Sequence, residues 1–238
     1  MTYSITGFVY LYGFLAFAFL SYRFYLNWQR EKTTVSKGFF LFMSIMSLMF
    51  IVTAIGGLFF ADSPGVLKFV EICVVFIQSS AAAVLGYLIP YMKIPKISPW
   101  LGFLMIFLSG LVATFLSAIT DERPFLEPNG VINWNIGPHN EILRPLIFLG
   151  VIMPIGIILI RQGMALKDKE AKIKAIGLGF AFLTGVFTGI LDFTLKSFFH
   201  FGASSVDISV VILATTMLTL IVLTQKSRKE KIMKILEE

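Results

Sequence analysis

The chain has 238 residues, of which 57% are hydrophobic and only 14% are charged, and its formal net charge is +6. A soluble domain carries about 25% charged residues, and here the apolar residues form long blocks between short charged clusters, so a soluble globular protein is excluded. Seven blocks approach the ~20 residues that cross a bilayer as a helix. They are continuous rather than alternating, which argues against a β-barrel. The expected fold is therefore all-α, a polytopic membrane protein with helices at about 5–25, 38–60, 66–91, 100–119, 143–160, 176–199 and 206–224, and a basic tail at 226–238.

The basic residues predict the orientation of this bundle. No positive charge precedes the first block, and Arg23, Arg30 and Lys32 follow it, which is typical of an anchor with its N-terminus outside. In that orientation the inside segments hold 16 of the 20 Lys and Arg residues. This is the distribution that the positive-inside rule requires, and it predicts a cytoplasmic C-terminus. The positive net charge thus reflects membrane topology, with anionic lipid and not nucleic acid as the partner.

The cysteine and histidine residues indicate neither a disulfide nor a metal site. Cys73 is the only cysteine, so an intrachain disulfide is excluded, and a buried thiol is expected. The two histidines lie near no Cys and in no paired carboxylate motif, so no metal site is predicted. No Ser/His/Asp set, HExxH motif or phosphate-binding loop is present either, and we expect neither an enzyme nor a bound cofactor.

Two polar residues lie in the third helix. Glu71 is about one turn from its outer end, and Gln78 follows seven residues later on the same face. Both could be polar residues near a helix end. Alternatively, Glu71 faces Lys196 or Arg144 across the bundle, which predicts non-additive effects of substitutions at Glu71 and Lys196.

The one long outside segment, 120–140, reads TDERPFLEPNGVINWNIGPHN. Its Asn-Gly pair favours a tight hairpin between short strands in FLE and VINWNI. Phe125 and Trp134 would give this hairpin an apolar face toward the bundle. The hairpin is then either a cap with an interfacial Trp or a lid over an outward-facing pocket.

A ridge of small residues on the sixth helix allows a neighbouring helix to approach closely, with SSAAAVLG (79–86) of the third helix as the matching surface. This ridge consists of Gly177, Ala181, Gly185 and Gly189.

The same helix ends in GILDFTLKSFFHFG, with Asp192 and Lys196 four residues apart on the packed face. A retinal lysine is disfavoured, because a further complete span follows and Lys196 lies near the outer end of its helix. The pair is either an i,i+4 pair with a snorkelling lysine or the lining of an outward cavity, since ionisable groups in membranes mark functional sites. The candidate ligand-binding residues are Glu71, Gln78, Trp134, His139, Arg144, Asp192 and Lys196.

Two stretches carry a family resemblance. The first is the block 100–119 followed by TDERPFLEPNGVINWNIGPHNEILRPLIFLGVIMPIGIILI, and the second is RQGMALKDKEAKIKAIGLGFAFLTGVFTGILDF. Together they resemble the fourth to sixth helices, with their loops, of a known family of sensor modules. That family is the seven-transmembrane N-terminal sensor module of bacterial histidine kinases and diguanylate cyclases. The resemblance covers essentially the whole chain in spacing and loop length, without a catalytic motif. It implies a sensor in a bacterial or archaeal inner membrane that detects an outside or membrane-borne small molecule or lipid.

The chain departs from that family after the seventh helix, where QKSRKEKIMKILEE contains no output-domain motif. Either a separate histidine kinase or cyclase receives the signal, or an output domain follows. The tail is too short for a sustained heptad pattern, although its apolar residues could begin a homodimer seam. A transporter is the alternative function, since Pro154 and Gly156 could break the fifth helix, but no internal repeat accompanies them.

Overall fold

The computed structural model describes residues 3–94, 96–199 and 202–237, except for the side chains of 190, 193–194, 196–199 and 222–237. Within this part of the chain it has seven helices, each long and apolar enough to cross a membrane by length and composition. They are α1 (Ile5–Glu31), α2 (Thr34–Phe59), α3 (Pro64–Lys93), α4 (Pro99–Ile119), α5 (Pro138–Ala165), α6 (Lys169–Phe199) and α7 (Ser204–Glu237). The predicted all-α, seven-helix membrane fold is confirmed.

Most helices extend beyond the apolar blocks that predicted them. Helix α1 continues to Glu31, and α5 and α6 begin five and seven residues earlier than expected. Hydropathy locates only the part of a helix that faces lipid, whereas caps determine where a helix begins. The hydroxyl of Ser4 accepts from the backbone N–H of Gly7 at the start of α1, and Thr33 caps α2 in the same way through Ser36.

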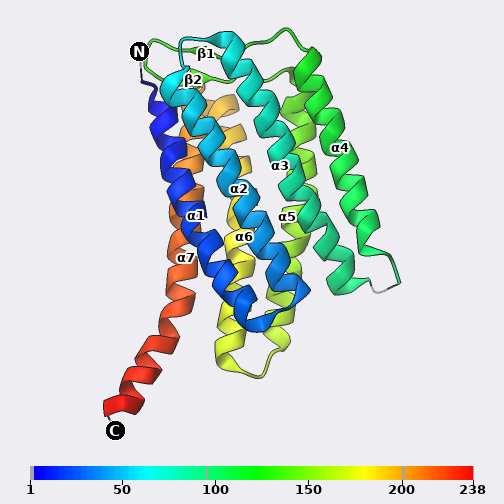
Figure 1. The fold of residues 1–238 in the computed structure, drawn as a ribbon, viewed down its shortest axis with the longest axis vertical. Coiled ribbons are helices and arrows are strands. Elements are labelled where there is room, and N and C mark those ends of the chain that lie inside the picture. The colour runs from blue at the N-terminus through cyan, green and yellow to red at the C-terminus, as the bar shows by residue number, and fades with distance from the viewer. Residues whose placement is uncertain (1–2, 95, 200–201, 238) are drawn as a thin grey trace.

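Six of the helices form a closed ring, and α4 lies outside it (Figure 1). Around the ring the neighbours are α1, α2, α3, α5, α6 and α7, and α7 returns to pack against α1. Helix α4 packs mainly on α3 and α5, and most of its surface remains exposed for lipid. At the end opposite the hairpin, α7 runs past the other helices (Figure 1).

Aromatic and sulfur-containing side chains fill the centre of the ring. Phe17 and Phe50 are almost completely buried, with ring centroids 4.8 Å apart across α1 and α2. Phe182 of α6 contacts Phe39 and Phe42 of α2 at 5.4 and 5.6 Å. These contacts hold α2 and α6 together across the ring.

Glycine contacts set the closest helix packing, but not on the predicted ridge. A Cβ at Gly86 would lie 2.8 Å from the carbonyl oxygen of Gly102, so α3 and α4 are in backbone contact there. On α6 the close approach is at Gly179, whose Cβ would lie 2.8 Å from the carbonyl oxygen of Gly156 in α5.

The ridge prediction was therefore wrong in its contacts, because α6 packs against α5 and α7, whereas the 79–86 surface of α3 packs against α4. A Cβ at Gly185 would meet only ordinary contacts at 3.6 Å, and one at Gly189 would meet nothing within 4 Å. Ala181 of the ridge is buried in the core, and Gly177 is half-buried.

The segment between α4 and α5 forms the predicted hairpin, with β1 (Phe125–Leu126) antiparallel to β2 (Ile132–Asn133). Gly130 adopts a φ of +82°, which a glycine allows without strain. The apolar face of the hairpin comes from Ile132, which is 1% exposed, together with Trp134. Phe125, expected on that face, is 44% exposed, because residues alternate between the two faces of a strand.

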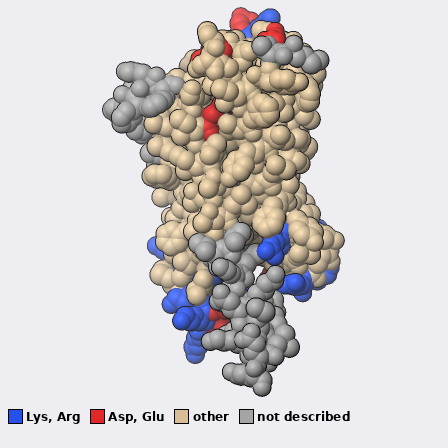
Figure 2. Space-filling view, turned by 90° about the vertical axis from the view of Figure 1, so that its left-hand side faces the viewer, with Lys and Arg blue, Asp and Glu red and all other residues tan. Residues whose placement is uncertain are grey.

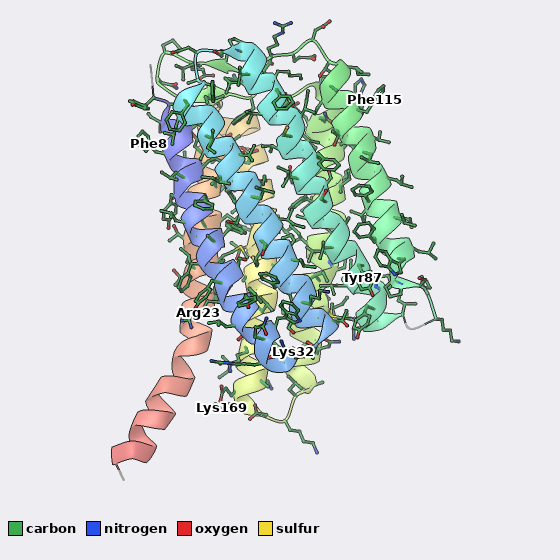
Figure 3. All side chains as sticks on the ribbon, in the orientation of Figure 1. Phe8, Arg23, Lys32, Tyr87, Phe115 and Lys169 are labelled. Atoms are coloured by element: carbon green, nitrogen blue, oxygen red, sulfur yellow. The ribbon has the colours of Figure 1, made fainter. Side chains whose placement is uncertain are left out.

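Charge divides the two ends of the bundle. Most of the visible Lys and Arg residues gather at the end opposite the hairpin, and a surface almost free of charged residues separates them from the acidic residues near the hairpin (Figure 2). Arg23, Lys32 and Lys169 lie at the first end, whereas Phe8 and Phe115 point outward near the second (Figure 3). We call these the basic end and the hairpin end.

Candidate functional site: the hairpin end

The hairpin is fixed to the first turn of α1 by its backbone. The backbone N–H of Ile5 donates to the carbonyl oxygen of Gly130 at 2.7 Å. Within the turn, the N–H of Val131 donates to Oδ1 of Asn129 at 3.0 Å, and the N–H of Glu127 donates to the carbonyl oxygen of Val131 at 2.8 Å. The turn thus has a fixed shape and a fixed position above α1.

A buried hydroxyl joins the hairpin to α7. Oγ1 of Thr6 accepts from the backbone N–H of Ile132 at 2.9 Å and donates to Oδ2 of Asp207 at 2.8 Å. Thr6 is fully buried, and Ile132 and Asp207 are 1% and 6% exposed. Strand β2, α1 and the first turn of α7 are therefore connected through one side chain, which we call the Thr6 link.

The first turn of α7 is also connected to α6. Oγ of Ser205 donates to Oδ1 of Asp192 at 2.6 Å. Gly202, just before α7, has a φ of +59°, so the chain reverses there without strain. Asp192 of α6 is therefore hydrogen-bonded to α7. Lys196, its predicted partner, has a side chain outside the described residues.

A cavity of about 230 Å³ opens at this end of the bundle. Residues 132–136 of the hairpin segment line one side, Glu141 of α5 lines another, and Gly202, Ala203 and Val206 at the start of α7 line the third. Its walls therefore belong to the elements that the Thr6 link and the Asp192 contact hold together. The hairpin segment therefore lines a cavity, and whether it acts as a cap or as a lid stays a prediction.

A second polar group joins α3, α4 and α5. Nζ of Lys68 lies 3.1 Å from Oε2 of Glu71 and donates to Oγ1 of Thr120 at 3.2 Å. Oγ of Ser117 lies 3.4 Å from Oε1 of Glu71 and accepts from Nδ2 of Asn140 at 2.7 Å. Glu71 is 3% exposed, so its charge is balanced inside the protein by Lys68.

Arg144 and Gln78 meet deeper in the bundle, about one turn beyond Asn140 on α5 and about two turns beyond Glu71 on α3. Nη2 of Arg144 in α5 donates to Oε1 of Gln78 in α3 at 3.0 Å. This is a cross-helix contact between two predicted residues. Among the described side chains, Glu71 forms its ion pair with Lys68 of its own helix, and Arg144 is near enough to interact with it electrostatically without forming an ion pair. The alternative pairing of Glu71 with Lys196 lies outside the described side chains.

The remaining predicted site residues fall into two groups. Trp134 lines the cavity and packs edge-on against Tyr10, with ring centroids 6.2 Å apart. Its Nε1 and Oδ1 of Asn140 are buried without a hydrogen-bond partner among the described residues. His139, by contrast, is exposed and does not line the cavity.

Sequence reasoning missed Thr6 and Asp207, which form the Thr6 link, and Ser117 and Asn140, which belong to the polar group around Glu71. A single threonine or serine in an apolar helix is common, so no local signal marks it. Asp207 could have been noticed as an acidic residue at the start of a membrane helix. Among the described residues, no group of three or more His, Cys, Asp or Glu residues lies close enough to hold a metal ion.

The chain matches no family model, and no curated protein or solved structure is significantly similar to it. The class of protein that the fold defines is a seven-helix membrane protein with a cavity at one end, lined in part by residues 132–136.

Proposed function

We propose that this chain is a membrane-embedded sensor module that detects a ligand in the cavity at the hairpin end and transmits binding through α7. The observation that carries the proposal is the Thr6 link, because it connects a wall of the cavity directly to the first turn of α7. Residues at the start of α7 also form part of the cavity wall. A ligand that moves the hairpin would move the start of α7 with it.

The charge distribution supports an orientation with the hairpin end outside. Basic residues concentrate at the other end of the bundle (Figure 2), and membrane proteins retain such segments in the cytoplasm. The cavity would then face the outside and the C-terminal end of α7 would face the cytoplasm. In a bacterial or archaeal cell membrane, a histidine kinase or cyclase is the output that the family resemblance implies.

Signalling requires two helix arrangements that bind the ligand differently. Helix α7 is suited to carry the change, since its main contacts around the ring are with α1 and α6. Near mid-membrane its contact with α1 includes a hydrogen bond of 3.0 Å between the hydroxyls of Tyr12 and Thr215 at the exposed surface. A helix held this way can slide or tilt without disrupting the aromatic centre between α2 and α6.

The experiment measures whether filling the cavity moves α7. Spin labels are attached to cysteines at Leu108 of α4 and Thr219 of α7, both exposed, after Cys73 is replaced by Ser. Val206→Phe places a larger side chain in the cavity wall. We expect the distance between the labels to shift by about 2 Å or to split into two populations, the size of known helix shifts in switching proteins.

The control is Val211→Phe, the same substitution on the same helix at a position that does not line the cavity and is 39% exposed. It should leave the distance distribution unchanged. If Val206→Phe and Val211→Phe give the same distribution as the parent protein, α7 does not respond to the cavity and the sensor proposal fails. The transporter alternative would then be tested by solute uptake into proteoliposomes.

A further inference from the structure

We infer that α1 and α2 bind one anionic phospholipid at the basic end, with its phosphate at Lys32 and Lys37 and an acyl chain in the groove between the two helices. The inference is independent of the proposed sensing role and of the hairpin-end cavity. It comes from the groove, from the two lysines at its mouth and from the depth to which the groove reaches.

A groove of about 340 Å³ runs between α1 and α2 on the surface of the bundle. Tyr22 and Tyr25 line it from α1, and Phe40 lines it from α2. Between these aromatic residues the lining is made of small side chains, including Ser21 and Ser44, which leave space that larger side chains would fill. Both tyrosines are exposed, so the groove is open to lipid.

The serines of the groove use their hydroxyl hydrogens inside the protein. Oγ of Ser44 donates to the carbonyl oxygen of Phe40 at 2.9 Å, and Oγ of Ser21 lies 2.7 Å from Oγ of Ser44, to which it donates. A ligand in this part of the groove therefore needs no hydrogen-bonding groups of its own. A hydrocarbon chain meets that condition, because it leaves no polar group unpaired when it is buried.

Two lysines from different helices converge at the mouth of the groove. The ring of Trp28 stacks on Phe40, with centroids 5.6 Å apart, and thus extends the wall of the groove. Nζ of Lys32 and Nζ of Lys37 lie 5.4 and 5.9 Å from the centre of that same ring. Neither lysine forms an ion pair among the described side chains, and Glu31 is the only acidic residue of α1 and α2. Two positive charges at one ring attract an anion.

The backbone places Lys32 over that ring. Lys32 has a φ of +53°, a left-handed conformation that is uncommon for a residue other than glycine, and its N–H donates to the carbonyl oxygen of Trp28 at 2.8 Å. This conformation ends α1 and turns the chain into α2 at the basic end (Figure 3). Nζ of Lys32 also donates to Oε1 of Gln29. Since an ammonium has three N–H donors, two remain for a phosphate.

The depth of the groove matches one leaflet of a bilayer. An aromatic belt at the interface would explain Trp28, but not a groove that continues past it. On α2 the lining residues Phe40, Ser44 and Ser47 follow Lys37 at spacings of three and four, so they share one face of the helix. From Lys37 to Ser47 the helix rises ~15 Å, half of a ~30 Å hydrocarbon core. A phospholipid with its phosphate at the lysines has its chain at this depth.

The test uses Trp28 as the reporter of lipid contact. Trp100 and Trp134 are replaced by Phe, which leaves Trp28 as the only tryptophan. The protein is placed in vesicles that mix phosphatidylglycerol with phosphatidylcholine, and bromine, which quenches tryptophan on contact, is carried on the acyl chains of one lipid or the other. Trp28 should be quenched preferentially by brominated phosphatidylglycerol. Each lysine should contribute about fivefold to that preference, the effect of one basic residue near an anionic surface.

The matched charge variants each remove two exposed lysines of the basic end. Replacing Lys32 and Lys37 together by Gln should bring the preference for phosphatidylglycerol close to one. Replacing Lys167 and Lys169 together by Gln is the control, because these lysines lie at the turn between α5 and α6 and do not line the groove. The control should keep the preference of the parent protein.

A second pair of variants tests the acyl chain. Ser44→Leu fills the groove and should reduce the quenching of Trp28 by brominated phosphatidylglycerol. Ser109→Leu on α4 is the control, since Ser109 also donates to a carbonyl oxygen of its own helix, that of Met105 at 2.9 Å, and should leave the quenching unchanged.

The inference is overturned if both lipids quench Trp28 equally, or if the two pairs of lysine substitutions reduce the preference equally, which would be a general effect of surface charge. Equal quenching in Ser44→Leu and Ser109→Leu would also overturn it, because the lipid would then contact the protein outside the groove. Quenching by neither lipid would mean that a second copy of the chain covers Trp28. The lysine variants decide the question even if Ser44→Leu fails to fold.

Discussion

Replacing Thr6 by Val tests the Thr6 link at nearly constant side-chain volume. The substitution removes the hydroxyl that bonds both Asp207 and the N–H of Ile132. Both partners are buried, so neither can bond to water instead. An unsatisfied buried group costs about 1–3 kcal/mol, and with two such groups we expect Thr6→Val to lower the free energy of unfolding by about 3 kcal/mol.

Thr53→Val is the control for this substitution. Thr53 is also a buried helical threonine, 1% exposed, but its hydroxyl donates only to the carbonyl oxygen of Met49 in its own helix at 2.9 Å. That oxygen can keep its backbone hydrogen bond, so the loss should stay below about 1 kcal/mol. Unfolding of both variants by denaturant in mixed micelles gives the comparison. Equal losses for Thr6→Val and Thr53→Val would refute the link as a stabilising connection.

Two further predictions concern the packing and the charges of α3. Gly86→Ala should destabilise the protein by about 1–3 kcal/mol, because its Cβ would lie 2.8 Å from the carbonyl oxygen of Gly102. Gly150→Ala is the control, because a Cβ at Gly150 meets nothing within 4 Å, and it should be neutral or stabilising. A lower melting temperature for Gly150→Ala than for Gly86→Ala would contradict the α3–α4 contact. Glu71→Gln should cost about 3 kcal/mol because it leaves the charge of Lys68 largely buried and unpaired. Adding Lys68→Met should recover part of that loss in a double-mutant cycle, whereas additive losses would exclude the ion pair.

The sequence predicted the helices and the hairpin because both depend on local patterns. Seven long apolar blocks are expected to form helices in lipid, because each segment must satisfy its own backbone hydrogen bonds there. The Asn-Gly pair likewise determined where the hairpin turns. Helix ends were less accurate; α2, for example, begins at Thr34 rather than near residue 38, because Thr33 caps it through a hydroxyl that hydropathy does not detect.

The packing partners could not be predicted in the same way. Small residues indicate that a close contact is available, but not which helix makes it, and the contact on α6 is at Gly179 rather than on the expected ridge. For the site, the sequence found Trp134 and both members of the Arg144–Gln78 contact. It missed Thr6, because a threonine acquires its role only when residues 126 and 201 positions away are brought to it.

The measurement that tests the central proposal most directly is the orientation of the two ends in the cell membrane. Cys73 is first replaced by Ser, and a single cysteine is then introduced at one of two exposed positions. One is Asp121 at the hairpin end, and the other is Lys167, between α5 and α6 at the basic end. The account predicts that a membrane-impermeant maleimide labels position 121 in intact cells and position 167 only after permeabilisation. Labelling of position 167 but not position 121 in intact cells would contradict it, because the cavity would then face the cytoplasm.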